Sequence, residues 1–221
     1  IQARMGSKRL PGKVLLKLDQ QNTVLDYVIQ QIRYSKKITK IIIATTSLKE
    51  DDPIEELAKT NGLLCFRGNT SDVLDRYYKC AKQFSLSIIV RITADNPLID
   101  PVIVDKAITK FNSNSYDYAS NAVIRSFPYG TETEIFSFTS LEKAWNNAKN
   151  DEREHVTSYF YNHPEKFKLL HIKNKNNLSL LRWTIDEYAD FLLVKKIVIK
   201  IKKRPILMND IISLFNREPD L

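Results

Sequence analysis

The chain has 221 residues and a formal net charge of +8; 43% of its residues are hydrophobic and 27% are charged. These values are ordinary for a globular protein that is long enough to form one large α/β domain. No apolar run approaches the ~20 residues that a membrane-spanning helix needs, so we expect no membrane insertion. No signal peptide precedes the first predicted strand, and we therefore expect a cytoplasmic protein.

The cysteines and histidines do not predict a metal or disulfide framework. Cys65 and Cys80 are too few for such a framework, and each has apolar neighbours, so we interpret both as small core residues. The three histidines lack the HExxH spacing of a zinc site.

The basic composition is compatible with nucleic acid, an anionic membrane or anionic metabolites as partners. Much of the positive charge falls in residues 195–204, where lysines alternate with apolar residues. This pattern is typical of an amphipathic helix with a solvated lysine face, so charge alone does not decide between these partners.

The first half of the chain alternates between strand-like and helix-like segments. It begins within a predicted strand and lacks an initiating methionine, so we expect further residues upstream. Thr23 suits the N-cap of a helix, with Asp26 three residues later, and Pro101 suits the first helical position. The β-branched run 40–45 is typical of a strand that is buried on both faces. The predicted strands are 1–3, 40–45, 63–66 and 87–93, and the predicted helices are 23–36, 53–58, 71–84 and 101–111.

These repeated strand–helix–strand units predict a parallel sheet covered by helices on both faces. We therefore expect a Rossmann-like (GT-A-like) α/β fold in which helices sandwich a mostly parallel sheet. Ligands of such folds bind beyond the carboxyl ends of the strands. The loop 4–13 and the turn 93–95 both follow strands, so we expect the two segments to lie together.

The second half of the chain is less regular. It contains no internal repeat and no low-complexity linker, so we predict a single domain over residues 1–221 with a small β-rich lobe inserted at about 117–180. The predicted strands are 117–120, 131–138, 168–172 and 180–184, and the predicted helices are 141–148, 152–162 and a segment from Tyr188 onward.

The opening segment, from Ile1 to Lys13, reads IQARMGSKRLPGK. Glycine lets the backbone approach a ligand closely, and successive N–H groups in such a turn form a concavity that binds anions. Arg4, Lys8 and Arg9 add positive charge together with Lys13, and arginine suits forked phosphate contacts. The spacing matches neither the GxxxxGK[ST] phosphate loop nor the dinucleotide fingerprint. We interpret the segment as a polyphosphate-binding loop; the alternative is a basic surface turn.

Two aspartates, Asp95 and Asp186, each follow a predicted strand directly. Mg²⁺ in enzymes that act on nucleotides usually takes one or two carboxylates together with substrate phosphates. Both residues are therefore candidate magnesium ligands. The alternatives are that Asp95 caps the turn that follows it and that Asp186 is an N-cap.

The opening segment resembles the signature of cytidylyltransferases that make CMP-sugars, which reads approximately ARxxSxRLPGKxL. In CMP-Kdo and CMP-acylneuraminate synthetases, a GDxPLI-like motif and a later VDTPEDL-like motif each carry a magnesium aspartate. This chain reads ADNPLI from Ala94 and IDEYADF from Ile185; the second match lacks the proline. The order and approximate spacing of the motifs agree over nearly the whole chain.

Two further segments resemble the spore-coat polysaccharide (SpsF-like) branch of this family. They are RGNTSDVLDRYY from Arg67 and DEREHVT from Asp151. The resemblance implies that the first lies over the nucleotide base, and that GTETE from Gly130 and the triplet from Arg153 lie where the family binds its sugar. A salt-bridged surface helix is the alternative for that triplet.

The resemblance implies roles for the following residues. Arg4, Lys13, Asp95 and Asp186 would be catalytic, and both aspartates would bind Mg²⁺. Ala3, Arg4, Gly6, Ser7, Arg9, Lys13, Thr45, Arg67, Asp72, Val73, Arg91 and Ala94 would bind the nucleotide. Glu132, Glu134, Arg153 and His155 would bind the acceptor, and the 117–180 insertion would serve acceptor binding and dimerisation.

The resemblance thus implies a Mg²⁺-dependent cytidylyltransferase that forms a CMP-activated sugar or polyol from CTP and releases pyrophosphate, for surface polysaccharide or glycan biosynthesis. The acceptor would be a sugar, a sugar acid or a polyol, with or without a phosphate, and the enzyme would be a homodimer. One alternative is a sugar-phosphate pyrophosphorylase that uses another NTP. A basic nucleic-acid-binding module is the other, but the sequence shows neither a named motif nor aromatic residues among exposed cations, so we expect no nucleic-acid partner.

Overall fold

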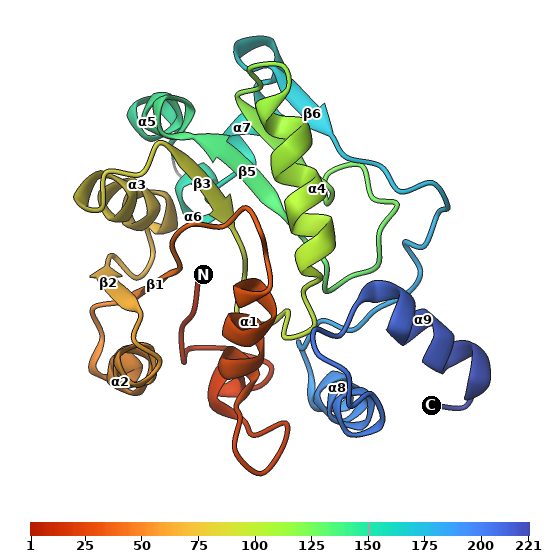
Figure 1. Ribbon diagram of the computed structural model, residues 1–221. Coiled ribbons are helices and arrows are strands. Elements are labelled where there is room, and N and C mark those ends of the chain that lie inside the picture. Colours follow the sequence, from red (N-terminus) through yellow and green to blue (C-terminus); the bar gives the residue numbers. More distant parts are fainter. Residues whose placement is uncertain (150) are drawn as a thin grey trace.

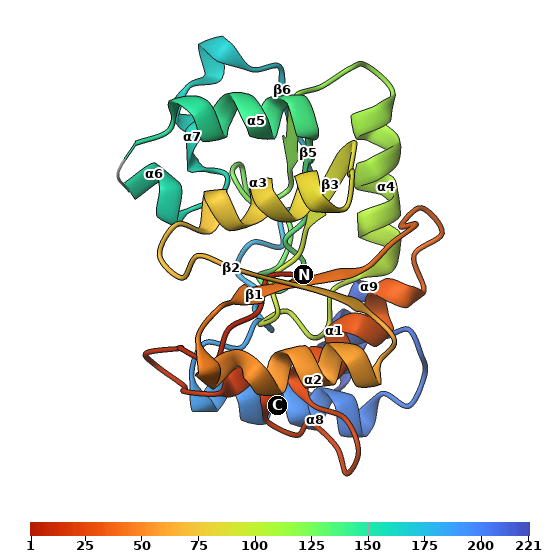
Figure 2. The ribbon, with the colours of Figure 1, turned by 90° about the vertical axis from the view of Figure 1, so that its left-hand side faces the viewer.

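The computed structural model describes residues 1–149 and 151–221, and its strands form a sheet between two layers of helices (Figures 1 and 2). β1 (Ile42–Thr46) pairs in parallel with β2 (Leu64–Gly68). A second set of strands has the order β3-β5-β4-β6. Its members are β3 (Ile88–Arg91), β5 (Glu134–Ser137), β4 (Tyr118–Ser120) and β6 (Leu169–His171).

The N-terminal segment joins the two sets of strands. Gln2 forms parallel bridges to both Ala44 and Thr93, so residues 1–3 lie between β1 and β3. Within the described strands, β5 runs antiparallel to β3 and β4, whereas β4 and β6 are parallel. The prediction of a mostly parallel sheet in an α/β fold is confirmed.

Helices cover both faces of the sheet. In Figure 2, α3 and α5 lie side by side in front of the strands, and α1 and α4 lie on the other face. The helices are α1 (Val24–Arg33), α2 (Asp52–Thr60), α3 (Val73–Gln83), α4 (Pro101–Asn112), α5 (Phe138–Asn147), α6 (Asp151–Glu154), α7 (Ser158–Asn162), α8 (Tyr188–Lys200) and α9 (Met208–Arg217). Three short 3-10 helices are η1 (Lys13–Leu15), η2 (Lys49–Asp51) and η3 (Pro164–Lys166).

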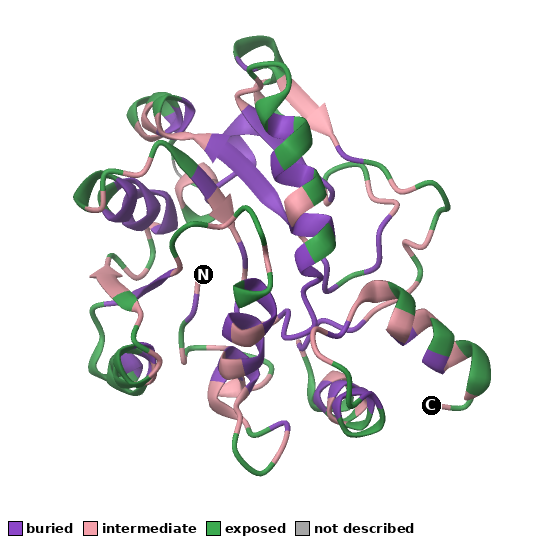
Figure 3. Ribbon diagram, in the orientation of Figure 1, coloured by how far each residue is buried: buried purple, intermediate pink, exposed green. Residues whose placement is uncertain are grey.

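Alternate side chains of a strand enter the cores on the two faces. Ile135 of β5 packs with Val104 of α4, and the next residue, Phe136, packs with Tyr77 of α3. Ile135 and Phe136 are fully buried because helices cover the sheet on both faces. Figure 3 shows this as a buried β5 between helices whose outward sides are exposed.

Several local predictions are confirmed. Thr23 and Asp26 form the capping box of α1, and Pro101 opens α4 after the N-cap Asp100. Cys80 is a buried core residue as predicted, whereas Cys65 is half-buried and packs against the core; neither is in a disulfide, and burial raises the pKa of each thiol to about 11.

Other predictions are wrong in detail. The single helix expected over 152–162 is divided into α6 and α7, and α9 was not expected. The strand expected over 180–184 is reduced to an isolated bridge between Tyr129 and Arg182. The segment 117–180, which was expected to form a β-rich lobe, contains β4, β5 and β6, and these strands continue the sheet that contains β3.

Candidate functional site: a cationic loop against two carboxylates

The phosphate loop, residues 4–13, leaves the sheet at Ala3 and folds back on itself. The backbone N–H groups of Ser7 and Gly12 both donate to the carbonyl of Met5, at 2.7 and 3.0 Å. Gly12 adopts φ of +67°, a left-handed conformation that favours glycine, and it forms the N-cap of η1. This turn directs Lys13 back toward the carboxyl ends of the strands.

Lys13 connects three segments that are distant in the sequence. Its ammonium donates to Asp95 Oδ2 at 3.1 Å, to Asp186 Oδ1 at 3.3 Å and to the carbonyl of Ile185 at 2.5 Å. Only 11% of the Lys13 side chain is exposed. The structure therefore brings together the loop and both predicted aspartates around one cation.

Asp95 is held in the turn that follows β3. Thr93 Oγ1 donates to Asp95 Oδ1 at 2.6 Å, and the backbone N–H of Ile185 donates to the Asp95 carbonyl at 2.8 Å. The latter bond ties the 93–96 turn to the segment that carries Asp186. The donors to the Asp95 carboxylate in the described residues are thus the side chains of Lys13 and Thr93, rather than a backbone N–H of the turn that follows it.

Asp186 contacts two arginines in addition to Lys13. Arg9 lies 2.8 Å from Asp186 Oδ1, and Arg182 lies 2.6 Å from Oδ2. Burial alone would raise the pKa of Asp186, but the hydrogen bond from Arg182 and the charges of Lys13 and Arg9 outweigh it and lower that pKa. The N-cap of α8 is Glu187, so Asp186 does not serve as the helix cap.

A cavity of about 530 Å³ opens beside these carboxylates. Its lining includes Asp95 and Asp186 as well as three of the predicted acceptor residues, Glu132, Glu134 and His155. His155 is exposed in the turn between α6 and α7. The cavity thus connects the predicted nucleotide and acceptor sides of the site.

Glu132 organises the wall of this cavity. Its carboxylate accepts hydrogen bonds from Asn96 at 2.9 Å, from the backbone of Gly130 at 2.8 Å and from Arg125 at 2.7 Å. Because Asn96 follows Asp95 directly, Glu132 fixes the aspartate turn against the 125–132 segment.

Glu134 is a buried residue of β5 that forms an ion pair with Arg91 of β3 and accepts a hydrogen bond from Tyr118 at 2.5 Å. Burial alone would lower the pKa of Arg91, but the Glu134 charge raises it above its usual range. Arg91 also donates to the Gln2 side chain. Both predicted residues line the cavity, and their charges neutralise each other.

Arg153 does not enter the cavity. Its guanidinium donates to Asp72 Oδ2 at 2.7 Å and to the carbonyl of Trp145 at 2.8 Å. Asp72 also caps α3 through the backbone N–H of Asp75. The structure therefore places Arg153 with the predicted base-binding segment, away from His155 in the cavity.

The predicted base-binding residues lie near the ends of β1 and β2. Arg67 donates to the backbone carbonyls of Thr46 and Leu48 and pairs with Asp52 and Glu55. Thr45 is fully buried, and its hydroxyl has no hydrogen-bond partner among the described residues.

The other residues predicted to bind the nucleotide differ in solvent exposure. Ala3, Val73 and Ala94 are buried, so they can offer backbone rather than side-chain contacts. Arg4 is exposed and makes no ion pair with any residue in the described ranges. At Gly6, a Cβ atom would lie 3.2 Å from Oε1 of Glu50, the end of an exposed side chain that has room to move.

Sequence reasoning missed three residues around the site. Arg182, which pairs with Asp186 and Asp190, lies in a segment without helical structure, so its spacing of four residues from Asp186 did not indicate an ion pair. Asp51 accepts a hydrogen bond from the backbone N–H of Met5 in the phosphate loop, and Arg76 is a fully buried arginine in α3. No local sequence pattern indicated the role of Asp51 or the burial of Arg76.

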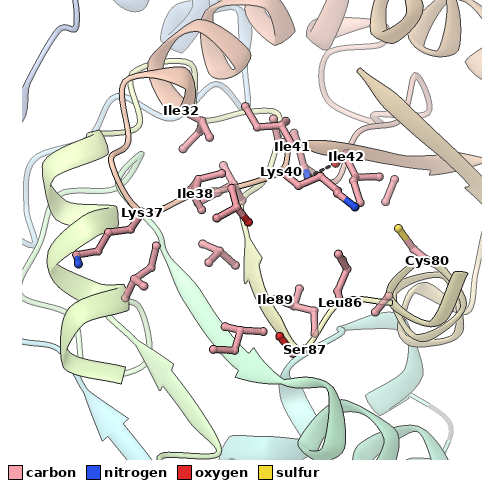
Figure 4. Close-up of a pocket in the computed structure, with 18 of the residues that line it drawn as sticks. Ile32, Lys37, Ile38, Lys40, Ile41, Ile42, Cys80, Leu86, Ser87 and Ile89 are labelled. Carbon is pink, nitrogen blue, oxygen red and sulfur yellow. Dashed lines mark hydrogen bonds between the residues drawn. The ribbon is translucent and has the colours of Figure 1, made fainter. Parts of the chain in front are cut away.

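A second cavity, of about 290 Å³, lies at the amino ends of β1 and β3 (Figure 4). Its lining is mostly apolar and includes Ile38, Ile42, Leu86 and Ile89. It lies at the edge of the sheet opposite to Lys13. Neither its lining nor its place suits a polyphosphate.

The donor set around Lys13 fits a divalent cation. Two carboxylate oxygens and one carbonyl oxygen already lie within 3.3 Å of a single positive charge. Within the described residues, no cluster of three or more acidic, histidine or cysteine side chains forms a complete metal cage. Mg²⁺ characteristically uses such incomplete sites, because substrate phosphates and water supply the other ligands.

A parallel-rich α/β sheet with a cationic loop and two carboxylates at the carboxyl ends of its strands defines a nucleotide-binding protein of the nucleotidyltransferase class. The cytidylyltransferase family model matches residues 1–214, and the chain belongs to the cytidylyltransferase family.

Two relatives support this assignment, and a more distant structure shares the fold. The chain is 36% identical to the spore coat polysaccharide biosynthesis protein SpsF of Bacillus subtilis, over 100% of this chain and 94% of that protein. It is similar to a cytidylyltransferase structure from Leptospira borgpetersenii, with 35% identity, a TM-score of 0.94 and coverage of 99% and 92%. CMP:2-keto-3-deoxy-manno-octonic acid synthetase, at 15% identity, TM-score 0.68 and coverage of 90% and 96%, shares the fold. None of the helices in residues 1–149 and 151–221 has the length and apolar character needed to span a membrane.

Proposed function

We propose that the chain transfers a cytidylyl group from CTP to an acceptor hydroxyl of a sugar, sugar acid or polyol, with Mg²⁺ held by Asp95 and Asp186. The observation that carries this proposal is the meeting of Lys13 with both carboxylates at the carboxyl ends of the strands. Membership of the cytidylyltransferase family supports CTP as the nucleotide.

The phosphate loop supplies the cations for the triphosphate. Lys13 and Arg9 now contact Asp186, and Arg4 is exposed beside them in the chain. A bound triphosphate would draw these cations away from the carboxylate, since phosphate oxygens carry more charge. Arg4, Arg9 and Lys13 would then stabilise the pyrophosphate as it departs.

Mg²⁺, when bound by Asp95 and Asp186, would neutralise charge on the phosphates and on the attacking oxygen. The acceptor hydroxyl oxygen forms a bond to the α-phosphorus and its proton passes to water, while the bond between that phosphorus and the bridging oxygen to the β-phosphate breaks and pyrophosphate leaves. Arg182 and Thr93 keep the two carboxylates oriented through their hydrogen bonds to Asp186 and Asp95. Catalysis would therefore rest on positioning and electrostatics.

The base would lie toward the ends of β1 and β2. Arg67 orders the turn after Thr46, and Asp72 begins α3, so the backbone between them can meet a base edge. The buried hydroxyl of Thr45, which has no hydrogen-bond partner in the described ranges, lies at the same end of β1.

The acceptor would occupy the 530 Å³ cavity beside Asp95. The SpsF relative takes part in spore coat polysaccharide biosynthesis, which supports a sugar-like acceptor for surface polysaccharide synthesis. His155 is an exposed polar group in this lining, whereas Glu132 and Glu134 are engaged in internal bonds. The family resemblance further supports a cytoplasmic homodimer formed by one domain over residues 1–221.

The experiment is to incubate the chain with each of four NTPs, Mg²⁺ and a panel of sugars, sugar acids, polyols and sugar phosphates, and to measure pyrophosphate release. We expect release with CTP and a hydroxyl acceptor, and its loss when EDTA removes Mg²⁺. Turnover with a sugar phosphate and another NTP would instead support a sugar-phosphate pyrophosphorylase. Salt-sensitive binding to generic DNA without any effect of nucleotides would contradict both.

A further inference from the structure

Asp51 is a buried carboxylate that faces the phosphate loop. Its exposed fraction is 0%, and it makes no ion pair with any side chain in the described parts of the chain. It occupies the N-cap position of α2, yet its side chain does not cap that helix. A buried charge without a paired cation is costly unless hydrogen bonds compensate it. The contacts that do compensate it therefore indicate its role.

Three donors converge on Asp51 from two segments. The backbone N–H of Met5 donates to Oδ1 at 2.7 Å, across 46 positions of sequence. The backbone N–H of Thr46 donates to Oδ2 at 3.1 Å, and the Thr46 hydroxyl donates to the same oxygen. Asp51 thus fastens the start of the phosphate loop to the carboxyl end of β1.

The turn 46–51, which carries Asp51, also accepts hydrogen bonds from Arg67. Arg67 Nε donates to the Thr46 carbonyl at 3.0 Å, and its Nη2 donates to the Leu48 carbonyl at 2.6 Å. The 46–51 turn therefore lies between the phosphate loop and the segment that begins at Arg67. One buried carboxylate sets the spacing between the two parts of the proposed nucleotide site.

We propose that Asp51 is a positioning residue for CTP: it holds the phosphate loop at the distance from the base-binding segment that the nucleotide requires. This inference rests on the proposed function. Small displacements of binding groups cost up to about 100-fold in turnover, because the reacting atoms must be aligned. Loss of the Asp51 anchor should thus weaken CTP use and leave acceptor binding unchanged.

The test compares Asp51→Asn with Asp100→Asn. Asparagine keeps the size of Asp51, but its amide places a donor against an N–H donor. We expect the KM for CTP to rise about 10-fold or more while the KM for the acceptor stays within about twofold. Amide hydrogen exchange in residues 4–12 should also become faster.

Asp100 is the matched control, because it too is buried and accepts three backbone N–H bonds. Those bonds come from Val102, Ile103 and Met208, away from the phosphate loop. Asp100→Asn should lower the melting temperature without changing the KM for CTP. An equal rise in that KM for both variants would overturn the proposal, since a general loss of stability would then explain it.

A milder pair keeps the test valid if Asp51→Asn does not fold. Thr46→Val removes the hydroxyl donor and Thr46→Ser retains it, so the KM for CTP should rise several-fold in the first and stay within about twofold in the second. Equal KM values for CTP in Thr46→Val and Thr46→Ser would overturn the proposal. Absence of CTP turnover in the wild-type chain would instead overturn the proposed function, and the exchange of residues 4–12 would still decide whether Asp51 anchors the loop.

Discussion

Lys13 and Asp186, 173 positions apart in the sequence, meet with the ammonium 3.3 Å from Oδ1, and the lysine is the more deeply buried partner. Its side chain is 11% exposed, against 21% for that of Asp186. The phosphate loop therefore extends to both carboxylates, and the Lys13 ammonium is largely shielded from solvent. Two of the predictions below follow from this arrangement.

Asp95→Asn should keep the fold and lower Mg²⁺-dependent pyrophosphate release by about 100-fold or more, because a charged ligand is lost from the electrostatic centre of the site. Turnover at saturating CTP and acceptor measures the effect, with circular dichroism as the check on folding. Glu56→Gln, on the exposed side of α2, is the control and should retain full activity. Near-wild-type turnover of Asp95→Asn would remove this residue from the site.

Arg9→Ala should weaken CTP binding far more than CMP binding, because Arg9 would contact the β- and γ-phosphates. Its side chain is 59% exposed, so the loss of its ion pair with Asp186 should change stability little. Isothermal titration with both nucleotides gives the comparison. If Arg9→Ala lowers the affinities for CTP and CMP by the same factor, Arg9 contacts something other than the β- and γ-phosphates.

His155→Ala should raise the KM for the acceptor several-fold and leave CTP affinity nearly unchanged, because His155 lines the cavity away from the phosphate loop. His163 is the matched control: it interacts with Glu152 outside this lining, and His163→Ala should change neither constant. Loss of CTP binding in a folded His155→Ala variant would mean that the nucleotide and acceptor sides are wrongly assigned.

Acid should destabilise the fold between about pH 4 and pH 2 through Asp19. Burial would raise the pKa of Asp19, but hydrogen bonds from Tyr27 and Asn22 outweigh it and lower the pKa to about 2. The folded carboxylate thus binds protons less readily than the unfolded one, so its stabilisation is present above pH 4 and is lost as the pH falls toward 2. Between pH 4 and pH 2, the free energy of unfolding measured in urea should fall less steeply for Asp19→Asn than for the wild-type chain. An equal fall in the two proteins would contradict this assignment.

The sequence predicted the first half of the fold well because β1 and β3 are rich in β-branched residues and α1, α3 and α4 carry side-chain caps. The run before Thr46 and the Thr23–Asp26 box both define their elements locally. Residues 152–162 were harder: the helical pattern there is interrupted at His155–Thr157, where the chain turns toward the cavity. The strand expected near Arg182 did not form because this segment makes an isolated bridge to Tyr129 rather than a continuous ladder with a neighbouring strand.

For the site, motif spacing predicted that the phosphate loop meets Asp95 and Asp186, since strand ends gather at one edge of the sheet. It could not predict which predicted side chains are already satisfied internally. Arg153 turns to Asp72, and Glu134 turns to Arg91. Such pairings depend on the packing of distant segments, and no local pattern specifies them.

The Lys13 ammonium bridges Asp95 and Asp186, the two carboxylates that would hold the proposed Mg²⁺. Metal and lysine should therefore compete for the same oxygens, and a nucleotide that attracts Lys13 would release them. Metal and nucleotide binding would then be cooperative even though the two ligands touch different side chains. Lys13→Gln should accordingly bind Mn²⁺ more tightly than the wild-type chain when no nucleotide is present, and titration by electron paramagnetic resonance measures this. Equal Mn²⁺ affinities of Lys13→Gln and the wild-type chain would contradict competition between Lys13 and the metal.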